Sequence, residues 1–103
     1  MKHQELDSFR RDLRRLSQIE RLAFLDVVHS DFHPACVRFA NDPTTRWPHG
    51  LRVKPVRGAP GVWEMTWSFA GPDGRATFEW IEVDGELVVR WRRIGGHEIF
   101  KQP

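Results

Sequence analysis

Residues 74–97 read GRATFEWIEVDGELVVRWRRIGGH, and this stretch decides the fold. Two runs of strand-forming residues flank Asp84-Gly85, a dipeptide that strongly favours a two-residue turn between antiparallel strands. The turn predicts strands over residues 75–83 and 86–94 and determines their register. The expected pairs are Val83 with Glu86, Ile81 with Val88, Trp80 with Val89, Glu79 with Arg90, Phe78 with Trp91, and Thr77 with Arg92.

Two further strands are expected before this hairpin. Residues 62–69 alternate in period two, and the turn-forming residues 70–74 join them to the hairpin. Residues 51–54 alternate apolar and basic side chains and predict an edge strand, because the following Pro55 cannot donate a ladder hydrogen bond. The face expected to form the core carries Trp63, Met65, Trp67, Phe78, Trp80, Val89 and Trp91.

The N-terminal third is predicted to be helical. Apolar residues at steps of three and four indicate an amphipathic helix over residues 6–16, whose outer face carries Arg10, Arg11, Arg14 and Arg15. Residues 17–20 match a capping box, so a second helix is expected to begin near Gln18 and to end or kink at Pro34. Its expected buried positions are Ile19, Leu22, Leu25, Val28 and Phe32.

These elements predict one α+β domain over residues 1–103, with a helical hairpin on one face of a four-stranded, mainly antiparallel sheet. The 40% hydrophobic and 29% charged residues are typical of a folded soluble domain. The single cysteine, Cys36, excludes an internal disulfide framework and a multi-cysteine zinc site within one chain. The sequence shows no apolar run of about 18 residues and no secretory signal, so we expect a cytoplasmic protein with no membrane segment.

The cationic residues are almost all arginine. Lysine and arginine together number 16, of which 13 are arginine, although the net charge is only +2. The planar guanidinium suits phosphate recognition. A GC-rich genome produces the same bias, so composition alone leaves both explanations open.

The polar face of the predicted sheet gathers arginine, threonine and glutamate side chains. With only two helices in the chain, this face is expected to remain open to solvent and available to RNA. Gly95-Gly96 then places His97 at its rim, where an imidazole could transfer protons near neutral pH. A surface ion-pair network is the alternative, with Glu79 and Arg90 as an ordinary cross-strand pair.

Arginines beside a histidine suit metal-independent cleavage of RNA. The 2′-hydroxyl of the substrate can attack the adjacent phosphorus, provided that the protein supplies a base, an acid and cations for the phosphoryl oxygens. No third ligand accompanies the pair His29 and His33, and no phosphate-binding glycine loop or dinucleotide motif is present. We therefore expect neither a metal nor a cofactor.

Most of the chain resembles the RelE/YafQ-type toxins of bacterial type II toxin–antitoxin modules. The segments GVWEMTWSF, GRATFEW and VVRWRRIGGHEIF follow a helical region in the order typical of that family. The most specific part runs from Arg93 to His97 with Phe100 after it, and is similar to the Arg-x-Gly-x-His…Phe ending of the YafQ branch. The resemblance implies a ribosome-dependent endoribonuclease that cuts mRNA and is held inactive by an antitoxin.

The resemblance also implies roles for particular residues. His97 would transfer protons, Arg93 would stabilise the phosphoryl charge, and Arg75 would bind the phosphate. Lys54 would assist charge stabilisation or proton transfer, and Phe100 would contact the bases. Arg52 and Arg92 are further candidates for substrate binding.

The sequence departs from the family pattern in three ways. Residues 1–6 are polar where the family has a short first strand, Thr66 replaces an arginine, and no tyrosine is present to act as a base. Two other functions therefore stay open. One is a non-enzymatic relative that inhibits DNA gyrase by contact, and the other is a non-toxic RNA-binding relative.

Overall fold

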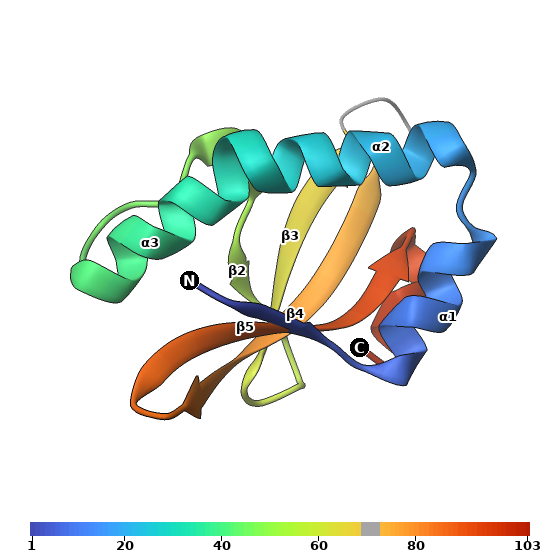
Figure 1. The fold of residues 1–103 in the computed structure, drawn as a ribbon. Helices are drawn as coiled ribbons and strands as arrows, with labels where there is room; N and C mark the ends of the chain where they lie inside the picture. The colour runs from blue at the N-terminus through green and yellow to red at the C-terminus, as the bar shows by residue number, and fades with distance from the viewer. Residues whose placement is uncertain (69–72) are drawn as a thin grey trace.

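The computed structural model describes residues 1–68 and 73–103 and contains a five-stranded mixed sheet with helices on one face (Figure 1). The sheet order is β1-β5-β4-β3-β2. Only β1 and β5 pair in parallel, and the other neighbours are antiparallel. The strands are β1 (His3–Glu5), β2 (Lys54–Pro55), β3 (Val62–Ser68), β4 (Gly74–Val83) and β5 (Glu86–Gly95).

The hairpin register predicted from Asp84-Gly85 is confirmed from the turn as far as the pair Phe78–Trp91. Asp84 and Gly85 have φ angles of 52° and 80°. Positive φ at both central residues is the geometry of the two-residue turn that matches strand twist. Phe69 and the turn residues 70–72 lie outside the described part of the chain, and so does that part of the predicted third strand.

The expected pair Thr77–Arg92 is wrong, because Thr77 lies opposite Arg93. The register shifts between Phe78 and Thr77, so β5 contains one extra residue, a β-bulge. Strict alternation would send Trp91 and Ile94 to opposite faces. Both are buried in the same core cluster, and the bulge allows this.

The sheet has five strands rather than the four predicted, because residues 3–5 form β1. This polar segment adds to the edge of β5, where Leu6 N–H donates to the Trp91 carbonyl at 2.9 Å. Backbone hydrogen bonds require no apolar side chain, and polar residues are well suited to a short edge strand.

The predicted edge strand over residues 51–54 is wrong at its first three residues. Leu51 ends a 3₁₀ turn (His49–Leu51) and is buried, and Arg52 has a φ angle of 48°, outside the strand region. Only Lys54–Pro55 pairs with β3. Leu51 therefore packs in the main core, and the alternation of residues 51–54 does not produce a strand of that length.

The helices are α1 (Asp7–Arg15), α2 (Gln18–Val27) and α3 (His33–Asn41), with a π-helical turn at Val28–Phe32 between the last two. The predicted capping box is confirmed, since the side chains of Ser17 and Glu20 each accept from the other's backbone N–H. Pro34 does not end the helical run, because the π turn accommodates its missing N–H. Helix α1 packs on β5, whereas α2 packs on β3 (Figure 1).

The predicted buried face of the second helix is wrong at three positions. Ile19, Leu22 and Leu25 are 81%, 57% and 58% exposed. Phe32 is buried as predicted, and so is Phe24, which the prediction did not include; the rings of both lie against Trp91. The two large aromatic side chains set the rotation of the helix about its axis and turn the aliphatic stripe (Ile19, Leu22 and Leu25) toward solvent.

We expect Leu22→Ser to change the free energy of unfolding by no more than about 0.5 kcal/mol, because this side chain makes little buried contact. Urea denaturation of the variant and the wild-type protein measures the difference. A large loss of stability would show that α2 packs with a different face toward the sheet.

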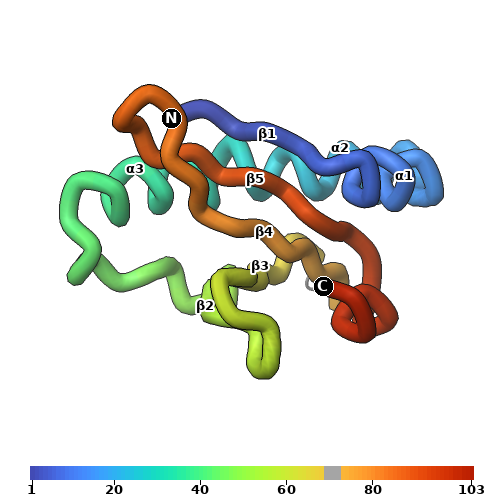
Figure 2. Tube along the Cα trace, turned by 90° about the horizontal axis from the view of Figure 1, so that it is seen from below, coloured from blue at the N-terminus to red at the C-terminus, as the bar shows by residue number. Residues whose placement is uncertain are grey.

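The predicted core face is confirmed, since the side chains of Met65, Trp67, Phe78, Val89 and Trp91 are all buried in one cluster. The opposite face is not open as expected. Its residues Thr66, Thr77 and Val88 are buried, and so is Ile99 of the 3₁₀ helix η3 (His97–Lys101). After β5 the chain turns back beside the end of β4 (Figure 2). The C-terminal segment therefore covers the end of the sheet near the predicted site.

Candidate functional site

The end of the β4–β5 hairpin brings together three of the predicted site residues. Arg75 lies opposite Gly95 in the ladder, and His97 follows two residues later at the start of η3. His97 is exposed, and its ring lies 5.7 Å from that of Phe100, centroid to centroid, in an edge-on arrangement. A solvent-accessible imidazole, an aromatic ring and a guanidinium thus lie at the same end of the sheet.

Arg75 is buried, and its guanidinium contacts Thr66 on the neighbouring strand β3. Its Nη1 donates to Thr66 Oγ1 at 2.5 Å and lies 3.5 Å from Asp73 Oδ2. Its Nε has no partner among the described residues. The threonine that replaces the arginine of the family pattern therefore serves as an acceptor for Arg75.

Arg52 joins Arg75 through a shared carboxylate. The exposed Arg52 donates from Nη1 to Asp73 Oδ2 at 3.2 Å, the same oxygen that faces Arg75. Two guanidinium groups thus share one carboxylate and leave a local excess of positive charge. A phosphate could take the place of Asp73 between these arginines.

Lys54 is exposed and lies on β2, an edge strand of the sheet. Residues paired on neighbouring strands form a row across the sheet, which runs from Lys54 through Glu64 and Thr77 to Arg93. Three strand spacings separate the ends of this row, about 14 Å. Lys54 therefore lies on the third strand from β5, the strand that leads to His97.

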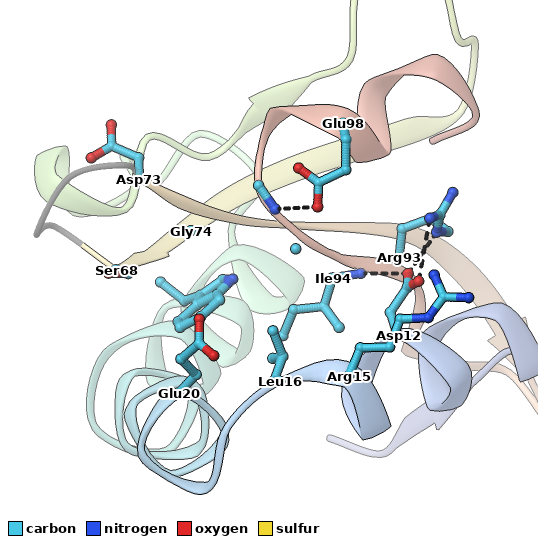
Figure 3. Close-up of a pocket in the computed structure, with 13 residues that line it drawn as sticks. Asp12, Arg15, Leu16, Glu20, Ser68, Asp73, Gly74, Arg93, Ile94 and Glu98 are labelled. Carbon is cyan, nitrogen blue, oxygen red and sulfur yellow. Dashed lines mark hydrogen bonds and ion pairs between the residues drawn. The ribbon is translucent and has the colours of Figure 1, made fainter.

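Arg93 is engaged by helix α1 rather than free. Its Nε and Nη2 donate to the two carboxylate oxygens of Asp12 at 2.6 and 3.2 Å, and its Nη1 donates to the Gln102 carbonyl (Figure 3). Asp12 also accepts from the Ile94 N–H. Arg93 is therefore a structural link between α1 and β5, and a phosphate would have to compete with Asp12 for its guanidinium.

Arg92 belongs to an ion-pair network on the polar face. Arg90 and Arg92 donate to the two carboxylate oxygens of Glu79, and Arg92 Nε donates to the Pro103 carbonyl. Burial alone would raise the pKa of Glu79, but the hydrogen bonds from Arg92 and Arg90 outweigh it and hold the pKa below its ordinary value. The alternative that the sequence left open, an ordinary cross-strand pair of Glu79 with Arg90, is confirmed.

A pocket of about 320 Å³ lies at this end of the sheet, between the α1–α2 corner and the strand ends (Figure 3). Its side chains include four carboxylates and two arginines, so it disfavours a phosphate. The phosphate subsite supported by the charges is instead that of Arg52 and Arg75. The pocket residues are Asp12, Arg15, Leu16, Glu20, Trp67, Ser68, Asp73, Gly74, Arg93, Ile94, Gly95, Gly96 and Glu98.

Sequence reasoning missed Asp12, the carboxylate that holds Arg93. Its signal was present, because Asp12 lies three residues after Phe9 and four before Leu16, on the same helix face. An acidic residue on an apolar face predicts a buried partner of opposite charge. The sequence does not say which of the thirteen arginines is that partner.

Within residues 1–68 and 73–103, no three histidine, cysteine or acidic side chains lie close enough together to hold a metal ion. Cys36 is buried, and its burial raises the pKa of the thiol to about 12. The thiol is therefore protonated and unreactive at neutral pH. No helix in the described part of the chain is long and apolar enough to cross a bilayer.

A pair of histidines links β1 to α3, away from this site. Trp91 Nε1 donates to His3 Nδ1 at 3.1 Å, and His3 Nε2 lies 3.2 Å from His33 Nδ1. Because an indole N–H can only donate, His3 carries its proton on Nε2 and donates it to His33. Protonation of either accepting nitrogen breaks this chain.

We expect acid to destabilise the protein through His3. Burial, then the nearby His33 and the Met1 amino group, lower the pKa of His3 to about 4 from an ordinary value of 6.5. A depressed folded-state pKa gives stability that is complete above pH 6.5 and is lost as the pH falls toward 4. Since the ring is partly exposed, we expect the loss to be about 2 kcal/mol, well below the full value of the shift.

His3→Gln supplies the matched control, because its amide can both accept from Trp91 and donate to His33 without titrating. Urea unfolding at pH 7 and pH 4.5 should show a smaller pH dependence for the variant than for the wild-type protein. Equal pH dependence in the two proteins would refute a contribution from His3.

Comparison of the chain with protein-family models, curated proteins and solved structures found no match.

Proposed function

We propose that this chain is a cytoplasmic toxin of a bacterial toxin–antitoxin pair, an endoribonuclease that cleaves mRNA at the ribosome without a metal ion. The observation that carries the proposal is the exposed His97 at the sheet end, with Phe100 against it and Arg75 on the neighbouring strand. The resemblance of residues 93–100 to the ending of the RelE/YafQ-type toxins supports the same function.

In the proposed reaction, the substrate 2′-oxygen forms a bond to phosphorus while the bond from phosphorus to the 5′-oxygen breaks. His97 transfers one proton, either from the attacking hydroxyl or to the departing oxygen, and water takes the other of these two roles. Arg75 and Arg52 bind the phosphoryl oxygens as Asp73 is displaced. Phe100 supports a nucleobase of the RNA, and Arg92 lies beside the RNA. Lys54 contacts the RNA farther from the cleaved bond. Arg93 holds the sheet end in place through Asp12.

The proposal includes a protein antitoxin, and we place its contact on the exposed stripe of α2. Ile19, Leu22 and Leu25 are exposed and recur every three residues, so they form a contiguous apolar stripe along one helix, a feature that can mark an interaction site. Arg11, Arg14 and Arg15 are exposed on the preceding helix α1. These charges favour an amphipathic partner helix with an acidic flank.

We expect Leu22→Glu to weaken binding of the antitoxin more than tenfold, because it places a carboxylate in the centre of the apolar stripe. Glu86→Leu, a change on the remote β4–β5 turn, is the matched surface control. Titration calorimetry with the antitoxin measures both affinities. Equal affinities would move the antitoxin contact to another surface.

The test of the enzymatic function is induced expression followed by mapping of cellular mRNA 5′ ends, with His97→Ala as the control. We expect new 5′ ends within translated codons for the wild-type protein and none for the variant. Growth arrest without new 5′ ends would refute RNA cleavage.

One observation favours a second function, inhibition of DNA gyrase by a non-enzymatic relative of the same fold. Arg52, Arg75, Arg92 and Arg93 all lie within ion-pair distance of carboxylates, which suits a binding surface as well as a catalytic one. A topoisomer assay with purified gyrase distinguishes the two functions, because only the gyrase inhibitor would block supercoiling.

A further inference from the structure

Glu98, the residue after His97, contacts the backbone of Gly96, the residue before His97. Glu98 Oε1 accepts from the Gly96 N–H at 3.0 Å, so the carboxylate spans the first turn of η3 (Figure 3). This hydrogen bond is the first cause of a Glu98 pKa below its ordinary value, and the charge of Arg93 adds to it. The carboxylate is therefore ionised at neutral pH, and the contact is a charge-assisted hydrogen bond.

The two glycines before His97 leave room for this carboxylate. A Cβ at Gly96 would lie 2.7 Å from Glu98 Oε2, and one at Gly95 would lie 2.7 Å from Oε1. Gly96 has a φ angle of −98°, which any residue adopts. An alanine at position 96 would therefore displace the Glu98 carboxylate and leave the backbone conformation unchanged.

The contact lies at the point where η3 leaves the sheet. Gly96 is the residue that precedes the first turn of η3, and its N–H would lack this acceptor without Glu98. His97 and Phe100 both lie on η3, and their rings contact each other. A change in the direction of this short helix moves the imidazole and the aromatic ring together.

We propose that Glu98 is a positioning residue, whose carboxylate on the Gly96 N–H holds the first turn of η3 and so fixes the imidazole of His97 relative to Arg75. The inference rests on the proposed ribonuclease function. Glu98 contacts its own backbone and not the substrate, so it acts through His97. The protein can then lose catalytic rate without losing affinity for RNA.

Three variants test this role. Glu98→Ala removes the acceptor, Gly96→Ala displaces the carboxylate but keeps it in the chain, and Glu98→Gln retains an acceptor oxygen. We expect kcat for RNA cleavage to fall about tenfold in the first two variants with KM within about twofold. Glu98→Gln should retain most of the activity, and the double variant should be no worse than either alanine variant. Glu86→Ala, an exposed carboxylate on the far turn, is the matched control.

The shift of the Gly96 amide proton by NMR reports the hydrogen bond independently of activity. We expect it to move upfield in Glu98→Ala and to stay near the wild-type value in Glu98→Gln. Wild-type kcat in Glu98→Ala, in a preparation where His97→Ala is inactive, would overturn the positioning role alone. Full activity of His97→Ala would overturn the proposed function together with this inference.

Discussion

Asp12→Ala is expected to lower the free energy of unfolding by about 3 kcal/mol, because it leaves the Arg93 guanidinium without its carboxylate in a partly dry environment. The Asp12 side chain is 8% exposed and accepts from both the Arg93 side chain and the Ile94 backbone N–H. For a domain of this size the loss corresponds to roughly 15 °C in melting temperature. Differential scanning calorimetry measures it directly.

Asp7→Ala is the matched control on the same helix. Asp7 forms an exposed ion pair with Arg10 at 3.8 Å, and such pairs contribute little to stability. We expect its melting temperature to stay at the wild-type value. If Asp12→Ala also melted at that value, the link between α1 and β5 would not be important for stability.

The ion pair between Asp12 and Arg93 also affects how the Arg93→Ala variant is interpreted. If Arg93 only stabilised the phosphoryl charge, as the resemblance implies, this variant would lose activity with the fold intact. In the structure, removal of Arg93 leaves the buried Asp12 carboxylate without its strongest partner, so the variant is also expected to lose stability. A loss of toxicity in Arg93→Ala therefore says little about catalysis.

The β4–β5 register could be predicted because a local dipeptide, Asp84-Gly85, determines it. The bulge at Arg92 could not, because it follows from the burial of Trp91 and Ile94 in one core, a three-dimensional requirement. Strand β1 was missed for a similar reason. Its polar side chains carry no strand pattern, and its hydrogen bonds depend on the exposed edge of β5.

The candidate site was predicted in part. The ladder places Arg75 opposite Gly95 and so brings the arginine to the strand end that precedes His97, as the hairpin pattern indicated. The resemblance assigned Arg93 to the phosphate, and the sequence does not show which side of a bulged strand its side chain takes. Its true partner, Asp12, depends on how α1 packs against β5.

The largest effect on function is expected from His97→Ala, which should reduce the rate of RNA cleavage at least 100-fold, the usual contribution of a positioned acid or base. The imidazole is exposed, and its ring lies against the ring of Phe100. Its removal should therefore leave the melting temperature nearly unchanged. Single-turnover cleavage of mRNA on programmed ribosomes measures the rate.

His49→Ala is the matched control, because His49 is also exposed and lies in the 3₁₀ turn before β2. We expect this variant to cleave at the wild-type rate. Equal activity of the two variants would exclude His97 as the proton-transfer group. A loss confined to His97→Ala, at an unchanged melting temperature, separates a chemical role for the imidazole from the structural role of Arg93, since Arg93→Ala should lose activity and stability together.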